Sequence, residues 1–115
     1  MRKLHPNQAE AIANALSIIL EENKRASRVL ENFIEEHPKW GVRDRNLFYG
    51  AVYDILRWKR LYSFYAGLKD TDIPYWSWLK TWCILHDYSI PDWNEMDCTP
   101  HLSKEEILAL SPPQE

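Results

Sequence analysis

Five cationic side chains lie close to aromatic residues in the segment 42–68 of this 115-residue chain. An arginine side chain donates two hydrogen bonds at once to a phosphate group, and an aromatic ring can stack on an unpaired base. The chemistry that this mixture favours is therefore contact with RNA. The cations are Arg43, Arg45, Arg57, Lys59 and Arg60, and the aromatic residues among them are Trp58, Tyr62 and Tyr65.

The charge of the chain is unevenly distributed. The net charge is −3, but residues 1–69 hold twelve Lys and Arg against eight Asp and Glu, a balance of +4. Residues 70–115 hold two against nine, a balance of −7. Such asymmetry indicates that the first half meets an anion. The alternative is an ordinary solvated surface, with the cations paired to Asp44, Asp54 or Glu31.

Few residues favour covalent or metal chemistry. Cys83 falls in an apolar helical pattern typical of core packing, and Cys98 follows acidic residues that raise a thiol pKa. The four histidines are scattered, and three isolated glycines cannot form a phosphate-cradling loop. We therefore expect no catalytic residue, no metal site and no bound cofactor within this chain.

The segment 42–68 has the apolar spacing of one long helix. Leu47, Phe48, Ala51, Val52, Ile55, Leu56 and Tyr62 recur at three- and four-residue steps. Gly50 lies inside this helix, and a close contact with another helix is the expected compensation for its weak helical propensity. Gly67 is expected to end the helix.

The rest of the chain also predicts helices joined by loops. One helix is expected from Pro6 to Glu22, with proline in its first turn, and a second carries the apolar residues between Ala26 and Ile34. A further helix follows Pro74, and Ser103 with Glu106 forms a capping-box pattern for a short last helix. No strand pattern is present. The fold class is all-α, a bundle of about five helices.

The helix after Pro74 contains three tryptophans, Trp76, Trp78 and Trp82. It is apolar nearly all round, so it is either central to the domain or covered by something outside this chain. Trp76 and Trp78 point about 200° apart on a helix. We therefore expect at least one of the three to dock against another domain or a partner.

No apolar run approaches the roughly 20 residues of a membrane span, and no signal-peptide pattern is present. Two cysteines are too few for a disulfide scaffold, which favours a cytoplasmic protein. The segment 111–115, Ser-Pro-Pro-Gln-Glu, is interpreted as the start of a linker to an absent domain, and residues 1–110 as one helical domain.

Residues 9–68 resemble the N-terminal, NusB-like helical domain of the Sun/Fmu (RsmB-type) ribosomal RNA cytosine-C5 methyltransferases. The matching pieces are the Ala-rich AIANALSIIL, the Ser-x-x-Leu of SRVL, the Asp-Arg pair opening DRNLFYGAVY, and the aromatic-x-x-x-Arg element Tyr53-Asp54-Ile55-Leu56-Arg57. Family members usually have Gly where this chain has Asp54, and Arg where it has Ala9.

The resemblance implies that this chain holds RNA, or packs against a following catalytic domain, in a longer methyltransferase. In that family the catalytic domain binds S-adenosylmethionine and supplies the attacking cysteine thiolate. The resemblance thus implies two partners, ribosomal or transfer RNA and a C-terminal catalytic domain of the same chain. Two alternatives stay open: a helical protein-interaction domain and a freestanding antitermination-type factor.

Overall fold

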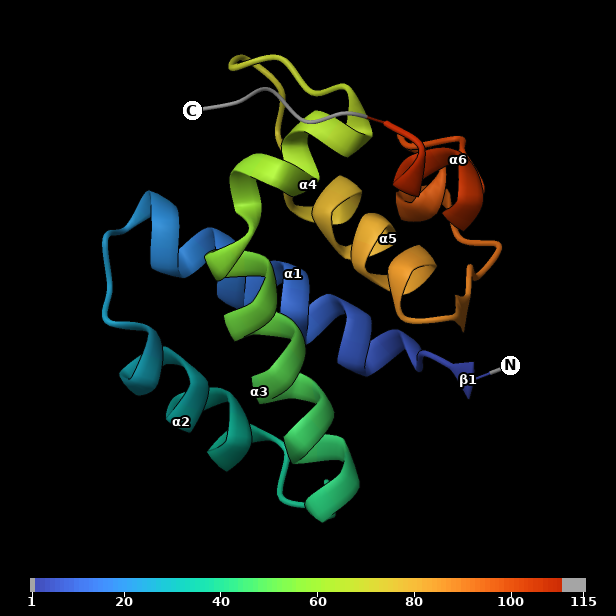
Figure 1. The fold of residues 1–115 in the computed structure, drawn as a ribbon. Helices are drawn as coiled ribbons and strands as arrows, with labels where there is room; N and C mark the ends of the chain where they lie inside the picture. Colours follow the sequence, from blue (N-terminus) through green and yellow to red (C-terminus); the bar gives the residue numbers. More distant parts are fainter. Residues whose placement is uncertain (1, 111–115) are drawn as a thin grey trace.

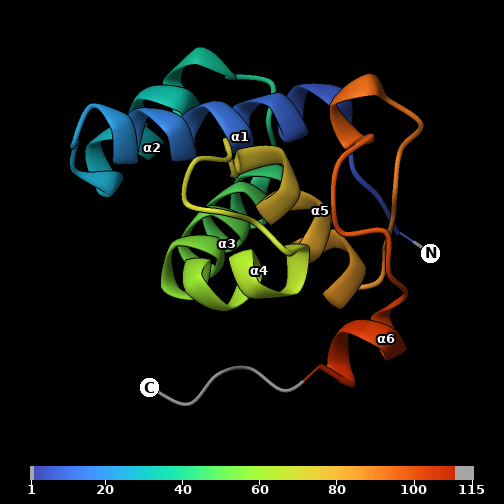
Figure 2. The same ribbon diagram turned by 90° about the horizontal axis from the view of Figure 1, so that it is seen from above.

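The computed structural model describes residues 2–110, and these residues form an all-α fold, as the sequence predicts. Six α-helices occur in this range, together with one 3-10 helix and two strands of two residues each (Figures 1 and 2). In chain order the elements are β1 (Arg2–Lys3), α1 (Pro6–Glu21), α2 (Ala26–Glu36), α3 (Val42–Arg57), α4 (Lys59–Ala66), α5 (Tyr75–Leu85), β2 (Tyr88–Ser89), η1 (Asn94–Met96) and α6 (Lys104–Leu108). The predicted linker, 111–115, lies outside the described residues.

Helix α5 is the centre of the bundle. It contacts α1, α3 and α4, and seven consecutive residues from Ser77 to Cys83 are buried. Three of these are polar: Ser77, Lys80 and Thr81. Lys80 donates 2.7 Å to the carbonyl of Cys98, and Thr81 donates 2.8 Å to that of Ser77. The all-round apolar pattern of this helix is therefore explained by neighbours within the domain.

Helix α1 supplies the second core surface. Its apolar residues Ile12, Leu16 and Ile19 are buried, together with four alanines between positions 9 and 15. The helix contacts α2, α3 and α5, and α3 crosses it in Figure 1. Its observed range ends one residue before the predicted end at Glu22.

The predicted single helix over 42–68 is wrong, because the chain breaks at Trp58 between α3 and α4. The break turns α4 toward α5, where the indole N–H of Trp78 donates 2.8 Å to Oγ of Ser63. Gly67 ends α4 in the left-handed region at φ +66°, as the sequence predicts.

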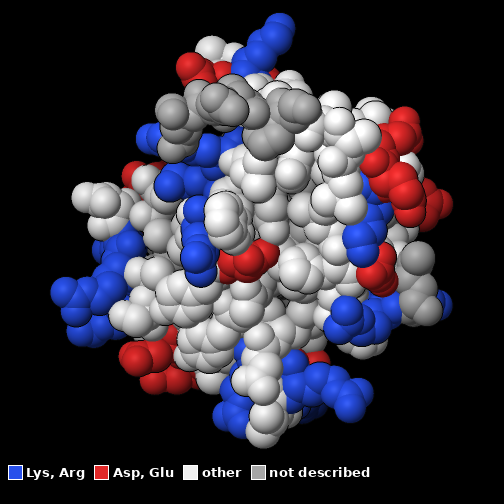
Figure 3. Space-filling view, in the orientation of Figure 1, with Lys and Arg blue, Asp and Glu red and all other residues white. Residues whose placement is uncertain are grey.

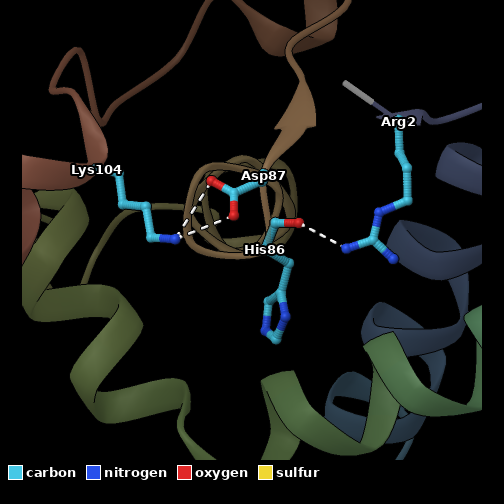
Figure 4. A network of polar contacts seen from close by, with 4 residues as sticks. All are labelled: Arg2, His86, Asp87 and Lys104. Atoms are coloured by element: carbon cyan, nitrogen blue, oxygen red, sulfur yellow. Dashed lines mark hydrogen bonds and ion pairs between the residues drawn. The ribbon is translucent and has the colours of Figure 1, made fainter.

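Two short strands, a hydrogen bond and an ion pair fix the segment after α5. Strands β1 and β2 pair in parallel, with Arg2 opposite Tyr88, although the sequence shows no strand pattern there. Figure 4 shows Arg2 and Lys104 reaching this segment from opposite sides, Arg2 to the carbonyl of His86 and Lys104 to the carboxylate of Asp87.

The last helix begins as predicted. The Ser103 backbone N–H donates 3.0 Å to Oε1 of Glu106, and the Glu106 N–H donates 3.2 Å to Oγ of Ser103. This reciprocal capping box confirms the sequence pattern. Within residues 2–110, no helix has the length and apolar character needed to cross a bilayer.

Candidate nucleic-acid interface

All five predicted RNA-binding cations have exposed side chains, but they do not form one continuous patch. Arg43 and Arg45 lie in the first turn of α3, and Arg57 is its last residue. Arg57 follows Arg43 by fourteen positions, a distance of about 20 Å along the helix. Figure 3 shows Lys and Arg on this face as separate groups with uncharged surface between them.

The two arginines at the start of α3 face different ways. Residues two apart on an α-helix point about 200° apart. Arg43 accordingly lines a cleft between α1, α3 and α5, whereas Arg45 is not among the residues of that cleft. The expectation of a single basic surface is thus corrected, because helix geometry sends Arg43 and Arg45 to opposite flanks of α3.

A regular line of four residues begins at Arg45 and winds around α3 by about 120°. It consists of Arg45, Tyr49, Tyr53 and Arg57. Each step of four residues advances about 40° around the helix, so the four side chains follow one gentle spiral. We call these four residues the Arg–Tyr stripe. It connects the two ends of α3 with two aromatic rings between two guanidinium groups.

The rings of the Arg–Tyr stripe are already stacked on each other. The centroids of Tyr49 and Tyr53 are 6.4 Å apart, and their planes differ by 9°. Tyr53 is 45% exposed, so its ring is open to a ligand. The ring of Tyr49 is half-buried and meets the edge of buried Phe48 at 6.1 Å, which anchors the stack to the core.

The stripe continues into the α3–α4 junction. The guanidinium carbon of Arg57 lies 5.0 Å from the ring centroid of Trp58, a cation–π contact, and Trp58 is 44% exposed. Lys59 and Arg60 follow with exposed side chains. This end of α3 therefore offers three cations beside one open indole.

Tyr62 and Tyr65, the other aromatic residues of the segment, do not belong to this open surface. Tyr62 is buried, and its hydroxyl donates 2.7 Å to Oδ2 of Asp54. Burial, together with this bond, raises the pKa of the Tyr62 hydroxyl far above its ordinary value. Tyr65 is half-buried against the core. Sequence reasoning instead missed Tyr49 and Tyr53, whose signal was their four-residue spacing between two arginines.

The three tryptophans of α5 are placed unequally. Trp78 and Trp82 are 5% and 6% exposed, so their indoles pack inside this domain. Trp76 is half-buried and packs against the edge of the core. Docking through this helix can therefore use Trp76 but neither of the other two.

The cysteines and histidines lie in different environments. Cys83 is buried in α5, and this burial raises its thiol pKa to about 12. Burial also raises the pKa of Cys98, with a smaller opposing effect from Ser77 and Lys80. His86 is exposed and places Nε2 3.4 Å from Oδ2 of Asp54. Within residues 2–110, no three His, Cys, Asp or Glu side chains gather into a metal-binding group.

Comparison of the chain with protein-family models, with curated proteins and with solved structures finds no match. The function proposed for this chain is therefore argued from its own surface chemistry and from the resemblance given above.

Proposed function

We propose that this chain is an RNA-binding domain that holds an unpaired RNA segment along the Arg–Tyr stripe. The proposal rests on one observation: two nearly parallel, partly open tyrosine rings stand between Arg45 and Arg57 along α3. Unpaired bases stack on such rings, while arginines contact the adjoining phosphates. Both interactions are largely independent of base sequence, so the domain would position RNA without reading it.

The α3–α4 junction extends this surface. Trp58 offers a further open ring, and Lys59 and Arg60 add cations beside Arg57. An α-helix rises about 1.5 Å per residue, so the path along α3 from Arg45 to Arg57 is roughly 18 Å long. A path of that length suits about four nucleotides of extended strand, which is within the range of single-strand binding sites.

The wider role follows from the family resemblance. We propose that the domain presents RNA to a C-terminal, S-adenosylmethionine-dependent cytosine-C5 methyltransferase domain of the same protein, acting in the cytoplasm on ribosomal or transfer RNA. In that arrangement the described residues bind and orient the substrate, and the chemical step belongs to the other domain.

Direct binding measurements test the RNA proposal. A fluorescently labelled unpaired RNA is titrated with the whole chain at low salt, and its anisotropy gives the Kd. Loss of one stacked base contact is worth about 1–3 kcal/mol, so Tyr53→Ala should weaken binding roughly 5- to 150-fold. The double variant Arg45→Gln/Arg57→Gln should weaken it by a similar factor.

A charge-matched control is available on other surfaces. Lys24 and Lys69 are exposed and lie outside the stripe and the cleft, so Lys24→Gln/Lys69→Gln removes the same charge. This control should retain the wild-type affinity within about threefold, a change set by net charge alone. Absence of RNA binding at tens of micromolar protein, or equal losses in the control and stripe variants, would contradict the proposal.

A second candidate function, docking of a protein partner, is favoured by one apolar site. Ile73 is 82% exposed just before α5, three residues from the half-buried Trp76. Ile73→Ser/Trp76→Ala should abolish association with the proposed catalytic domain and leave RNA affinity unchanged. Loss of RNA binding in this variant would instead place the RNA on the surface of Ile73 and Trp76.

A further inference from the structure

A second cationic site lies beside the first half of α3, and none of the four residues of the Arg–Tyr stripe lines it. It is an open cleft of about 660 Å³ between three parts of the chain: β1 with the start of α1, the first half of α3, and the end of α5 with β2. Clefts that bind small organic ligands commonly have volumes of about 300–1,000 Å³. The cleft is thus large enough for a ligand of nucleotide size.

Arg2 is held in position at the rim of this cleft. Its guanidinium donates 3.0 Å to the carbonyl of His86 (Figure 4). Its central carbon lies 4.6 Å from the ring centroid of Tyr88. The pairing of β1 with β2 fixes its backbone as well. An arginine has five N–H donors in a planar fork, so one donated bond orients the group and leaves donors for an anion.

Two further cations share the cleft, and its acidic residue does not neutralise them. Lys3 and Arg43 are exposed lining residues, and no carboxylate among residues 2–110 forms an ion pair with either. The one lining carboxylate, Asp44, accepts 2.6 Å from Gln8 and 3.3 Å from the N–H of Gly41. Three cations against one satisfied carboxylate give the cleft a local excess of two positive charges.

The cleft also offers a flat surface for a ring. His86 stacks on the buried indole of Trp82, with centroids 4.7 Å apart and planes 29° apart. Its side chain is 45% exposed, so the face away from Trp82 is accessible, and Figure 4 shows the ring directed away from the carbonyl that Arg2 contacts. The cationic rim can bind a phosphate group, and the open imidazole face can stack on a planar base. A ligand with both parts therefore suits this cleft.

Gly50 keeps the α3 wall of this cleft open. It is an exposed lining residue, and a Cβ added there would meet no atom within 4 Å. The close helix contact expected from the sequence at Gly50 is therefore wrong. Glycine is a poor helix former, so its position is explained better by the space it leaves beside the cleft than by packing.

We propose that this cleft binds a nucleoside 5′-monophosphate group, with Arg2, Lys3 and Arg43 on the phosphate and His86 against the base. The same chemistry is present in a free mononucleotide and in the 5′-phosphorylated end of an RNA. This site is separate from the Arg–Tyr stripe, and it does not depend on the function proposed for that stripe.

Titrations followed by amide NMR test this assignment on the whole chain. The probes are adenosine 5′-monophosphate, adenosine and inorganic phosphate. We expect adenosine 5′-monophosphate to shift the amides of Gly50, Ala51 and His86, and to bind at least about tenfold more tightly than adenosine or phosphate alone, because each of these offers only part of the recognition. Equal binding of adenosine and its monophosphate, or shifts confined to Tyr49 and Tyr53, would overturn the proposal.

Variants separate this site from the stripe. Lys3→Gln/Arg43→Gln should weaken binding of the monophosphate at least about tenfold, and Gly50→Leu, which fills the cleft, should do the same. Tyr53→Ala, at a residue that does not line the cleft, should leave monophosphate affinity unchanged. An effect of Tyr53→Ala equal to that of the cleft pair would overturn the proposal, whereas loss of RNA binding alone concerns only the stripe.

Two short unpaired RNAs that differ only in a 5′-phosphate identify the natural source of the ligand. Tighter binding of the phosphorylated than of the unphosphorylated RNA, with the difference lost in Lys3→Gln/Arg43→Gln, assigns the cleft to an RNA end. Equal affinity for the two RNAs, with the mononucleotide bound, assigns it to a free nucleotide. Failure of both ligands to bind at millimolar concentration, with the native amide spectrum intact, would overturn the proposal.

Discussion

The side-chain amide of Gln8 donates a hydrogen bond of 2.6 Å to Oδ1 of Asp44, which joins the first turn of α1 to the first turn of α3. Gln8 is 3% exposed, and its own carbonyl oxygen accepts 3.4 Å from the N–H of His5. The other oxygen of Asp44 accepts from the N–H of Gly41, just before α3. One buried amide therefore fixes the starts of two helices that border the cleft.

Replacing Gln8 with alanine should destabilise the domain. Hydrogen bonds to charged groups contribute about 1.5–3 kcal/mol, and the change also leaves Asp44 without one of its donors. Urea unfolding followed by circular dichroism measures the loss. Asn7→Ala, an exposed change in the same helical turn, should stay within about 0.5 kcal/mol. A Gln8 variant as stable as this control would contradict the assigned bond.

Alanine at two of the glycines should have opposite effects on stability. Gly50→Ala meets no neighbouring atom and improves helical propensity, so it should raise the free energy of unfolding by up to about 1 kcal/mol. Gly67→Ala forces a Cβ into the left-handed region at φ +66° and should lower it by about 1 kcal/mol. Thermal unfolding of the two variants gives the comparison, and equal signs would be inconsistent with this backbone.

The Tyr62 hydroxyl should make stability depend on alkaline pH. Burial and the bond to Asp54 raise its pKa above 10, so the folded protein keeps a proton that the unfolded chain loses. Its contribution is complete below pH 10 and falls as pH rises, by up to about 1.4 kcal/mol per pH unit.

Tyr62→Phe isolates this effect from the other tyrosines. At neutral pH the variant should be less stable than the wild type by roughly 1 kcal/mol, because one hydrogen bond is lost. The difference between the two proteins should shrink as pH rises from 9 to 11, roughly the range over which a free tyrosine titrates. Urea unfolding at each pH measures it, and a difference that does not change with pH would argue against a buried Tyr62.

The two cysteines should differ in reactivity. Cys83 is buried with a pKa of about 12, so very little thiolate forms at neutral pH, and a labelling reagent has no access to it. Cys98 is half-buried in the loop that Lys80 contacts and should be labelled first. Mass spectrometry of the native protein should find one added label, and labelling in urea should give two. Simultaneous labelling of both thiols in the native state would contradict the central position of α5.

Salt should distinguish the two kinds of stripe residue. For single strands the slope of log K against log salt is about −0.7 per contacted phosphate. Arg57→Gln should therefore reduce the steepness of the slope by about 0.7, while Tyr53→Ala should weaken binding and leave the slope unchanged. Anisotropy titrations between about 50 and about 200 mM salt provide both values. A changed slope for Tyr53→Ala would show that its contribution is not stacking.

The helices could be predicted from sequence where local signals were complete. Pro6 with the apolar spacing after it marked α1, and the Ser103–Glu106 pair marked the start of α6. The break at Trp58 had no such signal, because neither Gly nor Pro stands there. It is explained by packing of α4 on α5, a contact between residues about fifteen positions apart, such as Ser63 and Trp78.

The candidate sites were likewise only partly predictable from the sequence. The cations of segment 42–68 were evident from their residue types, but the pairing of Tyr49 with Tyr53 required the observed exposure of one flank of α3. The cleft was beyond sequence reasoning, because Arg2 and Arg43 are forty-one positions apart and meet there only through the fold.

By itself the sequence determined an all-α chain, the apolar side of each main helix and the enrichment of positive charge in the first half, since each depends on residue type and short-range spacing. Tertiary structure alone decided which cations line the cleft, which of the α5 tryptophans are buried, and where the chain turns at Trp58. The physical reason is that each helix is oriented by burying its apolar surface against elements distant in the sequence. That orientation in turn fixes the direction of every exposed side chain on the helix.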